Sequence, residues 1–98
     1  MSTPGFTQVQ IFRMVLDPKN NSPIVILRDP ESGALFPIWI GIFEAHAIAM
    51  KLEDIDAARP MTHDLLKGII DALGAKLERV EVVDLVESTY IARVHLRV

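Results

Sequence analysis

The sequence predicts an α+β fold in which two main helices pack on a mixed, largely antiparallel β-sheet. Three observations predict this class. Runs rich in β-branched and aromatic residues lie at both ends of the chain, two stretches with helical periodicity lie between them, and turn-forming residues separate these segments. Strands that cluster at the ends, instead of alternating with helices, favour α+β over a parallel α/β sheet. The expected order is β-β-β-α-α-β-β.

The first three strands are expected at residues 6–16, 24–28 and 35–40. The segments between them, DPKNNSP and DPESGA, consist mainly of residues that favour turns. Proline has no backbone N–H to donate to a neighbouring strand, so Pro37 indicates that the third strand lies at an edge.

Two helices are expected next, at residues 41–53 and 62–74. The first has apolar residues at i, i+3, i+4 and i+7 from Ala45 and further apolar residues on its other side, so we expect it to be buried nearly all round. In the second, Thr62 is expected to cap the first turn, and Gly74 is expected to take the left-handed conformation that ends helices.

Residues 76–86 and 89–98 are predicted to form a hairpin with a two-residue turn. This turn places Glu78 opposite Arg97. The doubled valine at Val83 interrupts the alternation of apolar and polar residues and predicts a β-bulge.

Composition limits the function classes. Half of the 98 residues are apolar, a high share for a chain that buries about 60–65% of its unfolded surface, so we expect self-association, with a dimer favoured. The absence of cysteine excludes disulfides and thiolate chemistry and, with no leader or membrane-spanning run, predicts a cytoplasmic protein. The net charge of −3 means that nucleic-acid binding requires a local basic patch or metal ions. At this length we expect a single domain over residues 1–98.

No phosphate-binding glycine loop, zinc-protease motif or nucleophile elbow is present, so candidate chemistry rests on carboxylates, histidines and arginines. Glu44 and His46 lie two residues apart, about 200° around the expected helix, and therefore do not converge on one ligand. Either Glu44 only stabilises the helix N-terminus, or it acts as a metal ligand or general base. His46 is expected in a core or subunit contact.

The start of the second helix holds further candidates. His63 and Asp64 lie in the first turn, where free N–H groups favour anions, and Arg59 precedes them. Asp64 and Asp71 share a face and are candidate ligands for magnesium or manganese, although seven residues span about 10 Å, too far for one ion without a third group. The alternative is helix capping and a solvated face on which Lys67 pairs with either aspartate.

Arg93, His95 and Arg97 alternate with apolar residues in the last strand, so the three basic side chains share one face. Such a ladder either protects a strand edge or contacts phosphate.

Three segments, PIVILRDPESGALFPIWIGIFEAHAIAM, RPMTHDLLKGIIDALGAKLERVEVVDL and TYIARVHL, together resemble the bifunctional nuclease domain family of bacteria and plants. The match runs from about Val9 to the C-terminus. It implies an α+β domain that often self-associates and whose plant members degrade RNA and DNA, and it supplies no established catalytic residues. Members usually continue into a segment with an RPSDAIALAL-like helix, so a chain that stops at Val98 is expected either to lack that segment or to be a short member.

We therefore predict a low-specificity nuclease that hydrolyses phosphodiester bonds in RNA and DNA with the help of magnesium or manganese. The predicted catalytic residues are His63, Asp64 and Glu44, the predicted metal ligands are Asp64, Asp71 and Glu44, and the predicted substrate-binding residues are Arg59, Arg93, His95 and Arg97. The alternative is a non-catalytic, oligomeric binding or regulatory module, which the acidic net charge and the lack of a recognisable carboxylate cluster favour.

Overall fold

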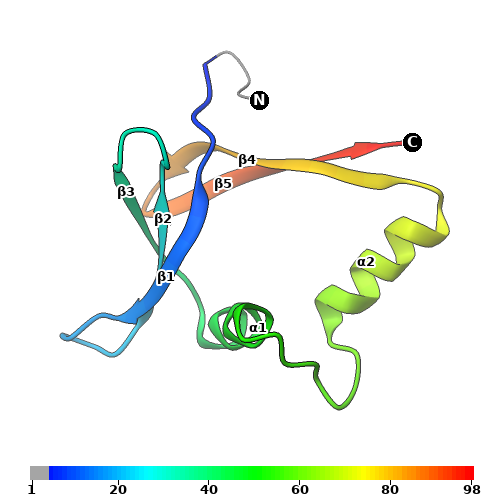
Figure 1. The fold of residues 1–98 in the computed structure, drawn as a ribbon, viewed down its shortest axis with the longest axis horizontal. Helices are drawn as coiled ribbons and strands as arrows, with labels where there is room; N and C mark the ends of the chain where they lie inside the picture. The colour runs from blue at the N-terminus through cyan, green and yellow to red at the C-terminus, as the bar shows by residue number, and fades with distance from the viewer. Residues whose placement is uncertain (1–4) are drawn as a thin grey trace. The chain divides into compact units, whose positions relative to one another are not determined.

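The computed structural model describes residues 5–98, with five strands and two helices (Figure 1). In chain order they are β1 (Gln10–Leu16), β2 (Pro23–Arg28), β3 (Leu35–Trp39), α1 (Ile42–Leu52), α2 (Thr62–Ala72), β4 (Lys76–Val86) and β5 (Thr89–Arg97). The α+β class and the predicted order of elements are confirmed. The described strands are all antiparallel and form two sheets, β1-β2-β3 and β4-β5, where the sequence predicted one mixed sheet. The chain divides into an N-terminal unit, Met1–Asp56, and a C-terminal unit, Ala57–Val98.

The N-terminal unit is a three-stranded sheet with one helix. β2 lies between β1 and β3, and Pro37 lies on the edge strand β3, as predicted. Ile24 and Val25 of β2 are buried, as is Ala45 of α1, which contacts β2. Burial of these apolar side chains joins the helix to the sheet.

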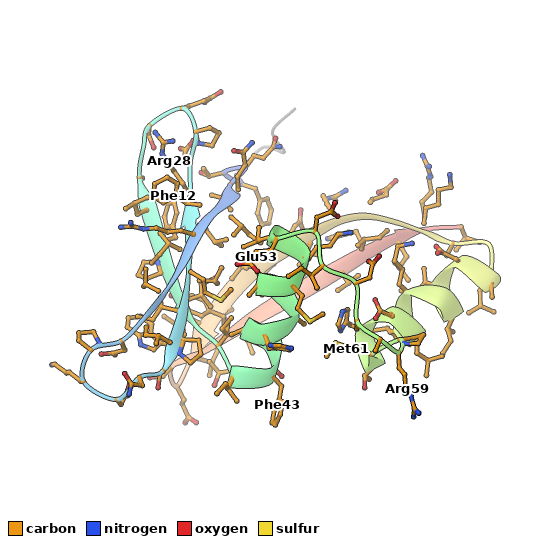
Figure 2. The ribbon with its side chains drawn as sticks, turned by 60° about the horizontal axis from the view of Figure 1, so that its bottom comes forward. Phe12, Arg28, Phe43, Glu53, Arg59 and Met61 are labelled. Atoms are coloured by element: carbon orange, nitrogen blue, oxygen red, sulfur yellow. The ribbon has the colours of Figure 1, made fainter. Side chains whose placement is uncertain are left out.

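α1 is less buried than predicted. Ala45 is its one buried residue, whereas Phe43 is 82% exposed, and Figure 2 shows the Phe43 side chain pointing away from the first turn. The expectation of burial nearly all round is wrong, because within its unit the helix packs on the sheet with one face. The helix ends at Leu52, and Asp54, which follows the C-cap residue Glu53, takes φ 57° and donates its N–H to the carbonyl of Lys51.

α2 begins at the predicted residue but is capped differently. Thr62 is the first helical residue and not the cap, so the expectation that it caps the first turn is wrong. The side chain of Asp64 instead accepts a hydrogen bond of 2.8 Å from the N–H of Met61. At the other end Gly74 takes φ 76°, as predicted for a residue that ends a helix.

The β4–β5 hairpin carries two bulges. Its register shifts once around Val83, as predicted, and again around Glu78, which was not predicted. Together the shifts displace the pairing by two residues. Lys76 therefore lies opposite Arg97, and the expected pairing of Glu78 with Arg97 is wrong.

The bulges sort the side chains of the hairpin into two faces. The apolar face consists of cross-strand pairs of apolar residues, Leu77–Leu96, Val80–Val94, Val82–Ala92 and Leu85–Tyr90. The charged face consists of the pairs Lys76–Arg97, Arg79–His95 and Glu81–Arg93. In these pairs like faces like, so the hairpin largely separates its apolar and ionisable groups; the pair Asp84–Ile91 is the exception.

The C-terminal unit buries few side chains. Among residues 57–98 only Ala75 and Glu81 are buried, and Leu65 and Leu73 of α2 are 63% and 75% exposed. Taken alone, this unit therefore has no apolar core. Both described helices have 11 residues, and neither is long and apolar enough to cross a membrane.

Candidate functional site

The charged face brings ionisable groups together from both strands of the hairpin. The Nε of Arg79 donates to Oε2 of Glu81 at 3.0 Å, and Nε2 of His95 lies 2.6 Å from Oε1 of the same carboxylate. Arg79 also approaches Glu78 at 3.4 Å. Arg93 lies opposite Glu81 in the register. The strands thus bring together residues that are up to 21 positions apart in sequence.

Glu81 is the acceptor that organises this face, and its side chain is only 9% exposed. The hydrogen bond from Arg79 is the main reason why the pKa of Glu81 is lowered, and the hydrogen bond and charge of His95 lower it further. Partial burial opposes these effects without overcoming them. Glu81 is therefore ionised at neutral pH and acts purely as a hydrogen-bond acceptor.

The carboxylate of Glu81 determines the tautomer of His95. Because an ionised carboxylate only accepts, the nitrogen that faces it, Nε2, must carry a proton. In the neutral ring Nδ1 then holds the lone pair. No hydrogen bond to Nδ1 is present within residues 5–98, and the side chain is 31% exposed. Nδ1 is therefore able to accept a proton from a bound molecule.

Three cations of the charged face, Lys76, Arg93 and Arg97, have no ion-pair partner in the part of the chain that the structure describes. Arg93 faces Glu81, but both carboxylate oxygens already bind Arg79 and His95. The charged face is therefore the kind of local basic patch that an acidic chain requires in order to bind phosphate.

The first turn of α2 holds a looser group. Nε2 of His63 lies 3.6 Å from Oδ1 of Asp64, and both side chains are at least half exposed. The other oxygen, Oδ2, accepts the N–H of Met61. Arg59 has no ion pair among the described residues, and Figure 2 shows its side chain pointing outward from the loop before α2. The structure therefore pairs His63 with Asp64 and does not join Arg59 to them.

Asp71 is paired within α2. Its Oδ2 accepts from Nζ of Lys67 at 2.9 Å, and this hydrogen bond raises the pKa of Lys67. Asp64 and Asp71 therefore have separate partners, and the structure does not bring them together. No group of three or more His, Cys, Asp or Glu side chains within residues 5–98 is arranged to hold a metal ion. Metal binding at Asp64 or Asp71 stays a prediction.

Glu44 lies in the N-terminal unit, and its carboxylate folds back over Gly41 at the start of α1. A Cβ atom on Gly41 would collide with the Glu44 carboxylate, so glycine leaves room for it near the positive helix end. A catalytic or metal-binding role of Glu44 stays a prediction. His46 lines a shallow, mainly apolar hollow between α1 and the strands β1 and β2.

A second basic feature, which the sequence did not predict, lies in the N-terminal unit. The guanidinium carbons of Arg13 and Arg28 each lie 5.5 Å from the ring centre of Phe12, and Figure 2 shows Phe12 and Arg28 close together. Phe12 is 49% exposed. An exposed ring beside arginines is suited to stacking on a nucleic-acid base.

Comparison with known families gives a match to the bifunctional nuclease domain over residues 25–98. The chain belongs to the bifunctional nuclease domain family. All residues of the charged face lie within the matched region. The first turn of α2 and Glu44 lie within it as well.

Two relatives of this bifunctional nuclease domain protein come from Mycobacterium tuberculosis. They are uncharacterized protein MT1877 of strain CDC 1551 and uncharacterized protein Rv1829 of strain H37Rv, each 39% identical over 85 residues. The similarity covers 87% of this chain and 52% of each relative. The chain thus spans about half the length of the curated relatives it matches.

Within this bifunctional nuclease domain, sequence reasoning found half of the charged face. It selected the β5 residues Arg93, His95 and Arg97 but missed Glu81 and its partners on β4. The alternation Val80-Glu81-Val82 did mark Glu81 as polar, yet its partner depends on the bulge at Val83, which moves Glu81 from opposite Val94 to opposite Arg93. Chemically, the assembled face can bind an anion and accept a proton at Nδ1 of His95.

Proposed function

We propose that this bifunctional nuclease domain acts as a low-specificity nuclease on the phosphodiester bonds of RNA and DNA. The observation that carries the proposal is the charged face, where Lys76, Arg93 and Arg97 lack ion-pair partners beside a histidine that a carboxylate holds. Lysine and arginine bind phosphate through charge and hydrogen bonds, and imidazole transfers protons. Membership of the family supports the same activity.

Low specificity follows from the kind of contact that this face offers. Contacts from Arg93 and Arg97 to phosphate position a nucleic-acid strand but carry no sequence information. Phosphates are common to RNA and DNA, so both are expected to bind. The overall charge of −3 limits attraction elsewhere on the chain.

Magnesium or manganese is proposed to assist hydrolysis, with Asp64 as the ligand to test. Mg²⁺ is commonly held by one or two carboxylates together with substrate phosphates, and Oδ1 of Asp64 has His63 as its neighbour at 3.6 Å. When bound, such an ion would activate a water molecule and offset charge on the phosphate. His63 is the proposed proton carrier and Arg59 the proposed phosphate contact at that end.

The test is cleavage of single-stranded RNA and DNA by the purified protein, with magnesium or manganese and with EDTA. We expect cleavage by the wild type and a strong loss in the double variant Arg93→Gln/Arg97→Gln. The matched control is Lys19→Gln/Lys51→Gln, which removes the same charge in the N-terminal unit and should cleave normally. An Asp64→Asn variant tests the metal ligand. Absence of cleavage, or full activity in the arginine variant, would contradict the proposal.

The second candidate function is a non-catalytic binding or regulatory module built as a homo-oligomer, with a dimer favoured. The exposed apolar residues of α2 and of the apolar face of the hairpin favour it, because a chain with that much uncovered apolar surface gains from association. Sedimentation equilibrium tests self-association. A dimer that binds RNA but cleaves neither substrate would support the module over the nuclease.

A further inference from the structure

We propose that the Glu81–His95 pair gives this protein a metal-independent ribonuclease activity, which cleaves RNA and not DNA by activating the ribose 2′-hydroxyl. The inference rests on the nuclease function proposed above. It names RNA as the substrate that the charged face cleaves without a metal ion. It follows from three features: a fixed proton acceptor, a carboxylate behind it, and flanking cations.

The proton acceptor is Nδ1 of His95. The hydrogen bond of 2.6 Å between Nε2 and Glu81 fixes the ring and leaves Nδ1 without a partner among the described residues. The side chain is 31% exposed, so the acceptor is accessible while the ring is held. A histidine that is oriented by a carboxylate in this way is the arrangement that general bases use.

The carboxylate behind the ring is well placed to stabilise the charge that forms. When Nδ1 takes a proton the ring becomes positive, and Glu81 lies in direct contact with it. The Glu81 side chain is 9% exposed, so water screens this attraction less than it would at an open surface. Arg79 also contacts Glu81 and holds it in the position that faces the ring.

The flanking cations are suited to the phosphate. Arg93 and Arg97 lie two residues before and after His95 on the same strand face, each about 6.5–7 Å along the strand from it. Arg93 and Arg97 can thus approach a phosphate beside the His95 ring from both directions along the strand. Arginines in this position stabilise the negative charge that builds up on phosphorus oxygens during the reaction.

The reaction balances without a metal ion. The 2′-hydroxyl proton passes to Nδ1, the 2′-oxygen forms a bond to phosphorus, and the bond between phosphorus and the 5′-oxygen breaks. The electron pair of that bond leaves with the 5′-oxygen, which takes a proton from water, and the imidazolium returns its proton to the hydroxide so formed. The products are a 2′,3′-cyclic phosphate and a 5′-hydroxyl. DNA lacks the nucleophile and is not cleaved by this route.

The experiment uses a short RNA oligonucleotide, the DNA of the same sequence, and an RNA with a single 2′-deoxy nucleotide at the main cleavage position, all in EDTA. We expect the wild type to cut only the RNA and to leave a 2′,3′-cyclic phosphate. The His95→Asn variant should lose about 100-fold or more in rate, the size of a general-base contribution. The matched control His46→Asn, a histidine of the N-terminal unit, should cleave normally.

Glu81 is a positioning residue and has its own readout. In the Glu81→Gln variant we expect a rate loss of roughly 10-fold, smaller than that of His95→Asn. The Glu81→Asp variant, which keeps a carboxylate to accept from the ring, should recover part of the rate. Equal rates of Glu81→Asp and Glu81→Gln would show that the carboxylate does not position His95.

Different failures are distinguishable. Cleavage of RNA and DNA only in the presence of magnesium or manganese, with His95→Asn as active as the wild type, overturns this inference and leaves the nuclease function intact. Cleavage of neither substrate under any condition overturns both. Cleavage of the modified RNA at its 2′-deoxy nucleotide in EDTA also overturns this inference. This result is obtained with the wild type, so it does not depend on whether a variant folds.

Discussion

The C-terminal unit contains two histidine–carboxylate pairs that differ in how they are built. His63 and Asp64 are sequence neighbours in the first turn of α2, 3.6 Å apart, with side chains that are 56% and 50% exposed. His95 and Glu81 are 14 residues apart in sequence but 2.6 Å apart in space, with side chains that are 31% and 9% exposed. The hairpin pair is closer and better shielded.

The two pairs differ because their carboxylates have different hydrogen-bond partners. At the start of α2 the carboxylate of Asp64 serves the helix, because it accepts the N–H of Met61. On the hairpin both Glu81 oxygens bind side chains, and one of them fixes the ring of His95. A carboxylate that satisfies backbone groups is less free for chemistry than one that holds another side chain.

Among the effects on binding and stability, the largest is expected for nucleic-acid affinity. In the Arg93→Gln/Arg97→Gln variant we expect binding of single-stranded RNA to weaken about 25-fold at 0.1 M salt, because each lost phosphate contact removes about 0.7 from the slope of log affinity against log salt. Arg59→Gln, on the α2 side, should weaken binding about 5-fold at most. Fluorescence anisotropy at several salt concentrations measures both. A larger loss of RNA affinity in Arg59→Gln than in Arg93→Gln/Arg97→Gln would show that the α2 side contributes more to binding than the hairpin.

A smaller effect is expected at α2. Asp64→Ala removes the acceptor for the N–H of Met61 and should lower the free energy of unfolding by about 1 kcal/mol. Asp56→Ala, in the loop before α2, is the matched control and should change it little. Urea denaturation measures the difference. Equal stability of Asp64→Ala and the control would show that Asp64 does not serve the helix.

The hairpin can be stabilised without altering the charged face. Its turn residues Glu87 and Ser88 take φ 50° and 65°, a conformation that favours glycine. Ser88→Gly should raise the free energy of unfolding by about 0.5–1 kcal/mol. Ser88→Ala keeps the Cβ atom and should bring no gain. An equal effect of both substitutions in urea denaturation would rule out this explanation.

The smallest effect is expected from pH. Because the pKa of Glu81 is lowered in the folded protein, its contribution to stability is present above its ordinary pKa of 4.5 and is lost as the pH falls through the lowered value. Thermal unfolding between about pH 3 and 6 should therefore show a weaker decrease with acid in Glu81→Gln than in the wild type. Parallel curves for the two proteins would contradict this assignment. Asp29, whose pKa is also lowered, remains in both proteins.

Most of the fold could be predicted from the sequence because local signals determine it. Turn residues separate the strands, and the periodicity of α2 and the glycine at Gly74 mark its extent. The division of the strands into two sheets could not be predicted, because pairing depends on contacts that no local pattern records. The burial of α1 was overestimated for the same reason.

Only part of the candidate site could be predicted from the sequence. Arg93, His95 and Arg97 could be found because strand alternation places them on one face. Glu81 was not assigned to His95, because the two-residue turn alone places it opposite Val94, and the bulge at Val83 moves it opposite Arg93, on the face that carries His95. Contacts across strands thus depend on register in a way that contacts within α2 do not.

The most direct test of the hairpin as the functional site is an NMR titration of the three histidine rings with a short single-stranded RNA. The signals of His95 should change most and in step with binding, and those of His46 should stay unchanged. Changes confined to His63 would contradict the account.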